Sequence, residues 1–341
     1  MALLADATDA KPVSKTAILV AGMHRSGTSA LTRVISLLGA ALPRNLLSPA
    51  FDNETGFWEP SRVVALHDKI LTSVHSHWSG LAGPPEGWFD SPPARACVKR
   101  IKRIVVAEYG DAPLIVVKDP RLSLLFPLWS RALDELGFAC KAVIAVRNPV
   151  EIVQSMAWRE HQRHSGEPWR PDRAALLFVR YHIAAERWTR SHPRTYVHYD
   201  DLLSDWRETA IRLSESFQLV WPCWSVGAET EVDRFLSTSH RHHRAADGVA
   251  PESELWRAWV DPVYSAVRSA CSSRAMDPAL FDRIQAAYDS AYGASARNLV
   301  ASTGAAAKIR SIVRPLNAGG AINWRERIFG RRIGLKLRRG F

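Results

Sequence analysis

The chain has 341 residues, of which 47% are hydrophobic, enough to build one large α/β core. It has only four cysteines and no CxxC pair, which excludes a disulfide-dense secreted scaffold and favours a reducing compartment. No apolar run reaches about 18 residues and no charged-then-apolar leader opens the sequence, so we expect a cytoplasmic protein without a membrane span.

The most informative segment is residues 17–31, which reads as a buried strand, a glycine loop and the first turn of a helix. The spacing Gly22-x4-Gly27 fits the phosphate loop GxxxxGK followed by Ser or Thr, in which backbone N–H groups surround an anion. Thr28 replaces the lysine that reaches the β and γ phosphates of ATP, and a cation, Arg25, stands inside the loop. The segment predicts a phosphate-like ligand, and the alternative is a plain strand-to-helix turn.

Two later strands also end in charged residues. The run 114–117 leads into Lys118-Asp119-Pro120-Arg121, and ligands in parallel sheets bind at such carboxyl ends of strands. An alternative role for Asp119 is a salt bridge with Arg121 or Arg147 that shapes the loop.

The second of these strands, 141–146, ends at Arg147, which is followed by Asn148-Pro149 and a helix that carries Ser155. Proline suits the first helical position. An arginine fork reads a phosphate bidentately, and the serine hydroxyl adds another donor, so the pair predicts a second anion site. The alternative is an unrelated surface arginine and a helix serine.

The remaining elements follow in alternation. Strands are predicted near 17–22, 114–118, 141–147 and 195–199, and helices near 28–39, 61–77, 94–109, 123–136, 149–163, 172–191, 202–217, 252–270 and 277–292. This order predicts a three-layer α/β fold with a central parallel sheet and helices on both faces. We expect a flexible N-terminus over 1–14, an α/β domain over 15–300 and a basic tail over 301–341.

The sequence Arg25-Ser26-Gly27-Thr28-Ser29, taken with Arg147 and Ser155, resembles the sulfotransferases that use 3′-phosphoadenosine 5′-phosphosulfate (PAPS). Arg25 takes the place where many members carry lysine, and both residues keep a fixed positive charge. The resemblance covers roughly residues 15–245. It implies a P-loop nucleotide-hydrolase-like fold and sulfuryl transfer from PAPS to a hydroxyl of a carbohydrate or glycolipid. The PAPS-binding residues that it implies are His24, Arg25, Ser26, Gly27, Thr28, Ser29, Arg147, Ser155 and Arg241.

The resemblance also implies catalytic roles. Lys118 would neutralise the phosphate oxygen that leaves, Arg25 would lie beside the sulfonate, and Glu59 would take the proton of the acceptor hydroxyl. Glu54, Asp119 and His24 are reserve candidates for the base. The alternative for Glu59 is a charge placed at a helix N-terminus by the helix dipole. We expect direct in-line transfer with no metal and no covalent enzyme intermediate.

Two further segments resemble the family less specifically. In residues 195–203, Tyr199 would pack near the PAPS loop or the adenine, and Asp200 and Asp201 would cap the next helix. In the cationic run 239–244, Arg241 or Arg244 would close over PAPS, and a solvated loop is the alternative. Adjacent histidines in this run lack the separated partners of a zinc site.

The charge of the chain is concentrated in the tail. Residues 308–341 carry ten of the 45 lysines and arginines and a single acid, Glu326, with apolar residues interleaved. Such a segment suits peripheral contact with the anionic inner face of a membrane. A nucleic acid, an acidic partner or plain solvation are the alternatives, and we expect no nucleic-acid partner.

Two other functions compete with sulfuryl transfer. A P-loop kinase-like phosphotransferase is disfavoured because the loop lacks its lysine. A non-catalytic membrane or nucleic-acid binder that acts through the basic tail would have no use for charged residues at several strand ends.

Overall fold

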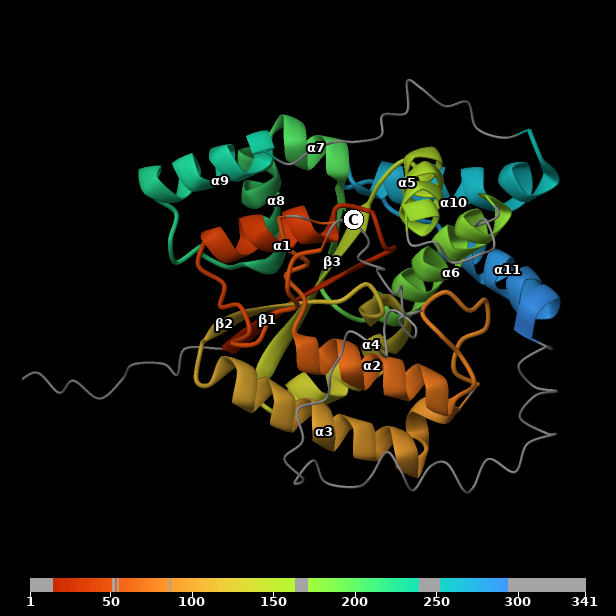
Figure 1. Cartoon of the computed structure of the whole chain (residues 1–341), viewed down its shortest axis with the longest axis horizontal. Coiled ribbons are helices and arrows are strands. Elements are labelled where there is room, and N and C mark those ends of the chain that lie inside the picture. The colour runs from red at the N-terminus through yellow and green to blue at the C-terminus, as the bar shows by residue number, and fades with distance from the viewer. Residues whose placement is uncertain are drawn as a thin grey trace, which may run out of the picture. The chain divides into compact units, whose positions relative to one another are not determined.

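The computed structural model describes residues 15–50, 53, 55–85, 87–162, 171–238 and 252–293. Its centre is a parallel sheet of four strands in the order β2-β1-β3-β4 (Figure 1). The strands are β1 (Lys15–Gly22), β2 (Leu114–Lys118), β3 (Phe138–Val146) and β4 (Arg194–His198). In this register Val20 of β1 is opposite Lys118 of β2, and Gly22 is opposite Ala145 of β3. The predicted α/β fold with a parallel sheet is confirmed.

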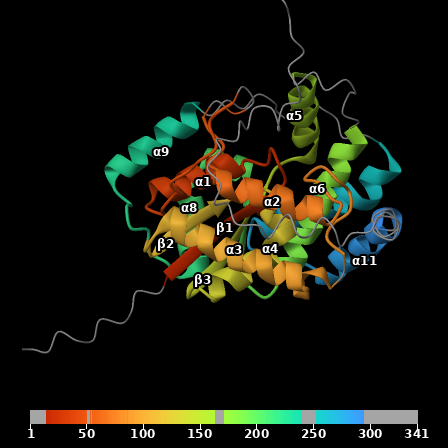
Figure 2. The ribbon, with the colours of Figure 1, turned by 60° about the horizontal axis from the view of Figure 1, so that its bottom comes forward.

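Alternate residues of β1 separate the two helical layers. Ile18 and Val20 pack into the core with α1 (Thr28–Leu37), α7 (Tyr199–Ser204), α8 (Trp206–Phe217) and α9 (Val226–Thr238). Leu19 and Ala21 pack into the opposite core with α2 (Ser61–Ser73), α3 (Pro92–Tyr109), α4 (Leu122–Asp134), α6 (Pro171–Thr189), α10 (Asp261–Ala270) and α11 (Pro278–Tyr288). Figure 1 shows α1, α8 and α9 together on one side of the strands and α2 and α3 on the other, and Figure 2 shows α9 and α11 at opposite ends of the view. Because both faces are covered, β1, β2 and β3 carry continuous apolar runs rather than an alternating pattern.

Four short or peripheral elements complete the described chain. They are the helix α5 (Pro149–Gln162), the 3₁₀ turn η1 (Trp88–Asp90) and the π turns η3 (Trp256–Val260) and η4 (Asp289–Gly293). Among the helices of these ranges, none is both long enough and apolar enough to cross a bilayer. The predicted N-terminal segment 1–14 and tail 301–341 lie outside the described residues, so the domain boundaries stay a prediction.

One helical prediction was wrong, and one helix was missed. The single helix expected over 202–217 is two helices, because Asp205 leaves the helical conformation and its carboxylate accepts from the Glu208 N–H to begin α8. Helix α9 was not predicted. Its sequence contains glycine, threonine and valine, which are poor helix formers, and the helix is stabilised by packing Val232 and Phe235 into the core beside α1.

Candidate functional site

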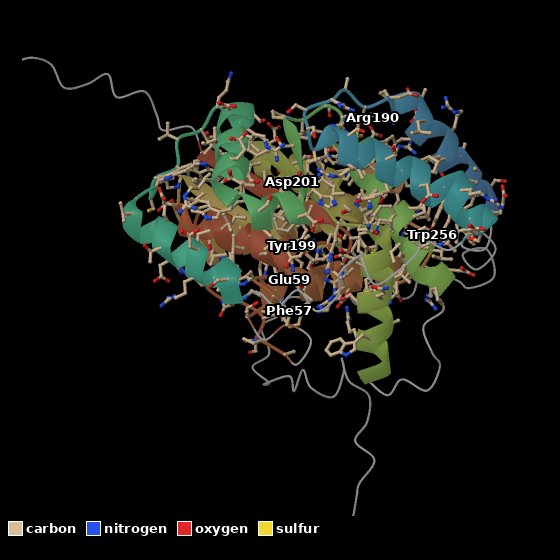
Figure 3. The ribbon with its side chains drawn as sticks, turned by 90° about the horizontal axis from the view of Figure 1, so that it is seen from above. Phe57, Glu59, Arg190, Tyr199, Asp201 and Trp256 are labelled. Atoms are coloured by element: carbon tan, nitrogen blue, oxygen red, sulfur yellow. The ribbon has the colours of Figure 1, made fainter. Side chains whose placement is uncertain are left out.

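The parallel sheet brings the predicted site residues to one edge. The loop after β1, Lys118 at the end of β2, Arg147 after β3 and Tyr199 after β4 all follow the carboxyl ends of neighbouring strands. Figure 3 shows Tyr199, Glu59 and Phe57 close together in the view from above. The hydrogen bonds and ion pairs among these side chains therefore determine what the site can bind.

The loop between β1 and α1 has the backbone of an anion cradle. Arg25 and Gly27 have left-handed backbone angles, with φ of 70° and 86°. Gly27 is the cap of α1, and glycine has no side chain that could bond to the N–H groups at the start of this helix. Ser26 is buried, and its Oγ has no hydrogen-bond partner within the described structure. Left-handed turns at a helix start form a concave set of donors that fits an oxygen-rich anion.

Tyr199 forms the floor beneath this loop. A Cβ atom placed on Gly27 would lie 2.3 Å from Cδ2 of the Tyr199 ring, so only glycine fits at this position. The guanidinium of Arg147 lies 5.0 Å from the centroid of the same ring. The prediction that Tyr199 packs near the first loop is confirmed, and the same ring also lies against the Arg147 guanidinium.

The second predicted anion site directly contacts the first. Arg25 Nε donates to Ser155 Oγ at 2.9 Å, and Arg147 Nη1 donates to the Arg25 carbonyl at 3.2 Å. Arg147 is buried and its Nε donates to Glu151 Oε2 at 2.7 Å. The structure therefore brings Arg25, Arg147 and Ser155 into direct contact, whereas the sequence predicts two separate anion sites. Sequence reasoning missed Glu151, whose signal was its position four residues after Arg147.

Lys118 and Glu59 form a buried ion pair beside the loop. Lys118 Nζ lies 2.6 Å from Glu59 Oε1 and also donates to the Phe57 carbonyl at 3.0 Å and to Ser29 Oγ at 3.2 Å. Burial raises the pKa of Glu59, and the charge of Lys118 opposes this without cancelling it. A carboxylate with a raised pKa next to a fixed cation can accept a proton from a hydroxyl near neutral pH.

The backbone at Trp58 explains how two groups of one short segment reach the same lysine. Trp58 has φ of 55°, which is unfavourable for a bulky residue and reverses the chain between Phe57 and Glu59. Helix α2 begins only at Ser61, with Pro60 as its cap. The main partner of Glu59 is therefore Lys118, rather than the helix dipole that was the alternative interpretation.

His24 lies in the first loop among aromatic rings. Its ring centroid is 4.7 Å from that of Trp78 and 5.6 Å from that of Tyr181. Burial lowers the pKa of His24 well below its usual value, and the charges of Arg121 and Arg159 lower it further. Its Nε2 is buried and has no hydrogen-bond partner in the part of the chain that the structure describes. The lowered pKa disfavours the charged imidazolium at this position of the loop.

Asp119 forms a salt bridge with Arg121, which is the structural alternative that the sequence left open for this residue. Its oxygens accept from Arg121 Nη1 at 3.0 and 2.7 Å, and His67 Nδ1 lies 3.1 Å from Oδ2. Burial acts to raise the pKa of Asp119, but Arg121 and His67 together hold it well below its usual range. A carboxylate held ionised by two partners is a weak base, so Asp119 shapes the loop after β2.

The predicted caps at Asp200 and Asp201 are wrong. The side chain that accepts at the start of α7 belongs to His198, whose Nδ1 is 3.3 Å from the Asp200 backbone nitrogen. Asp201 instead forms a two-pronged ion pair with Arg268 of α10, at 2.7 and 2.9 Å. The sequence motif placed acids in the first helical turn, where the dipole favours them, but tertiary packing gave one of them a partner.

Three predicted candidates lie outside the described residues, namely Glu54, Arg241 and Arg244. Within the ranges that are described, no group of three His, Cys, Asp or Glu side chains is arranged to hold a metal ion.

Comparisons with known proteins point to one family. A model described as "Sulfotransferase family" matches residues 17–222, which is more than half of the chain. No curated protein matches the sequence.

Solved structures are similar at low identity. Sulfotransferase STF9 from Mycobacterium avium is 15% identical with a TM-score of 0.46, over 77% of this chain and 78% of that chain. The sulfotransferase domain from the curacin biosynthetic pathway is 15% identical with a TM-score of 0.40, over 77% of this chain and 99% of that domain.

Proposed function

Because this chain belongs to the sulfotransferase family, we propose that it moves a sulfuryl group from PAPS to a hydroxyl of a carbohydrate or glycolipid. The observation that carries this proposal is the junction of two anion-binding elements at one sheet edge. Arg25 of the first loop bonds to Ser155, and Arg147 bonds back to the loop. A nucleotide with anionic groups on both the 5′ and the 3′ oxygens of its ribose would occupy both elements at once.

The residues present fit PAPS on structural grounds. The left-handed loop and the unpartnered Ser26 hydroxyl suit the 5′-phosphosulfate, and Thr28 and Ser29 begin the helix that follows. Arg147 and Ser155 would hold the 3′-phosphate, which ATP lacks. PAPS supplies the activated sulfuryl group, and the chain supplies its binding and orientation.

Glu59 and Lys118 are the proposed catalytic pair. Glu59 takes the acceptor proton, for which its raised pKa is favourable. Lys118, held 2.6 Å from Glu59, provides positive charge where negative charge develops on the leaving oxygen. Arg25 supplies a second cation from within the loop.

The carbohydrate or glycolipid acceptor rests on the surroundings of Glu59. Phe57 and Trp58 precede it directly in the chain, and aromatic faces suit sugar acceptors. A cytoplasmic location, with the basic tail against the inner face of the membrane, would give access to a lipid-linked acceptor.

Ligand binding separates this proposal from the kinase alternative. We expect 3′-phosphoadenosine 5′-phosphate (PAP), the desulfated product, to raise the melting temperature of the full chain, and ATP with magnesium to have little effect. Stabilisation by ATP with magnesium alone would instead support the phosphotransferase. A screen of labelled sulfate transfer from PAPS onto glycans, glycolipids and phenols then tests the acceptor class, and transfer to phenols alone would refute it.

A further inference from the structure

Glu151 is an unexpected neighbour for a phosphate site. It is 1% exposed, and its carboxylate contacts Arg147, the residue assigned to the 3′-phosphate. A carboxylate repels a phosphate and is costly to bury, so its presence calls for a compensating role. We propose that Glu151 is a positioning residue that fixes the direction of the Arg147 guanidinium and thereby sets the preference for a 3′-phosphate. This inference rests on the proposed function.

Among the described residues, three recorded contacts bear on the direction of the Arg147 guanidinium. Glu151 accepts from Nε at 2.7 Å, the Arg25 carbonyl accepts from Nη1 at 3.2 Å, and the Tyr199 ring lies 5.0 Å from the guanidinium carbon. A guanidinium is planar, so an anchor at Nε together with a ring against one face determines where its terminal nitrogens point. Of these three contacts, Glu151 is the one that carries a full charge, and charge-assisted hydrogen bonds are the stronger ones.

The junction between β3 and α5 holds Glu151 in place. Asn148 Oδ1 accepts from the Val150 N–H at 2.9 Å, and the Asn148 carbonyl accepts from the Ile152 N–H at 3.1 Å. Glu151 therefore stands in the first turn of α5, where the helix dipole favours a carboxylate and offsets part of its burial. The positioning group and the arginine belong to one rigid turn.

The test measures the preference for a 3′-phosphate. PAP and adenosine 5′-monophosphate differ by that group alone, so the dissociation constant of the monophosphate divided by that of PAP, both measured by calorimetry on the full chain, isolates the preference for a 3′-phosphate. We expect Glu151→Ala to lower this ratio by about tenfold or more, through weaker PAP binding with little change for the monophosphate. Glu151→Gln should retain most of the ratio, because its amide oxygen still accepts from Arg147 Nε.

Glu186 provides a matched control. It is also buried and bonded to an arginine four residues away, Arg190, but it lies near the start of β4, at the opposite end of the sheet from the site. Figure 3 shows Arg190 well separated from Tyr199 and Glu59. Glu186→Ala should cost stability and leave the ratio unchanged.

An unchanged or increased ratio in Glu151→Ala would overturn the positioning role. If that variant does not fold, Glu151→Asp decides the matter, because it keeps the charge and withdraws it by one methylene. A fall in its ratio supports positioning, and an unchanged ratio overturns it. Failure of the proposed function itself is recognised separately, because the wild-type chain would then bind PAP no more tightly than the monophosphate.

Discussion

Gly27→Ala tests whether Tyr199 really forms the floor of the anion loop. The methyl group would stand 2.3 Å from Tyr199 Cδ2, whereas ordinary contact requires about 3.4 Å. The ring would have to move by about 1 Å, and it is buried with Arg147 beside it. Gly137→Ala is a matched control, because Gly137 also has a left-handed backbone, with φ of 75°, but has no atom within 4 Å of its added Cβ.

The two substitutions share one cost and differ in another. Both force alanine into a left-handed conformation, which costs about 1–2 kcal/mol. Only Gly27→Ala adds overpacking, which costs about 1–3 kcal/mol in a well-packed site. We therefore expect Gly27→Ala to lower the free energy of unfolding by about 1–3 kcal/mol more than Gly137→Ala does. It should also weaken PAP binding, which Gly137→Ala should leave intact.

Urea unfolding and calorimetric titration with PAP measure both effects. Adding Tyr199→Ala to Gly27→Ala should make the combined loss of stability smaller than the sum of the single losses, because the clash disappears with the ring. Equal destabilisation by Gly27→Ala and Gly137→Ala, with additive effects in the double variant, would refute the close packing of Tyr199 against the loop.

Three further predictions follow from other parts of the chain. Glu59→Gln should slow turnover by about 10²–10⁴-fold while PAP still binds, because the amide can accept from Lys118 but cannot take a proton; near-normal rates would remove Glu59 from the role of base. Burial lowers the pKa of His182 to about 4. Between pH 6.5 and 4 the His182 side chain is therefore protonated in the unfolded chain and neutral in the folded chain. Stability should fall by roughly 3 kcal/mol between pH 6.5 and 4 on this account, and His182→Gln should unfold in urea with a shallower pH dependence; equal slopes would contradict this. Deleting residues 308–341 should reduce sedimentation with vesicles of anionic lipid, and an unchanged pellet would end the membrane proposal.

Short-range patterns in the sequence were sufficient for the sheet and for the position of the site. The four apolar runs and the helices between them predicted a parallel sheet, and parallel strands necessarily end at one edge. The spacing of Gly22 and Gly27 predicted the loop, because its geometry depends on residues that are adjacent in the chain.

The partners of the charged residues were decided only by the tertiary structure. Lys118 pairs with Glu59 across 59 positions, and Arg25 reaches Ser155 across 130 positions. Both contacts depend on how strands and loops pack together, and no local pattern encodes that packing. The same limit applied to Asp201, which found Arg268 instead of a helix cap, and to α9, whose sequence is a weak helix former until its apolar face meets the core beside α1. Local sequence thus fixes where charges enter the site, and long-range packing fixes which of them meet.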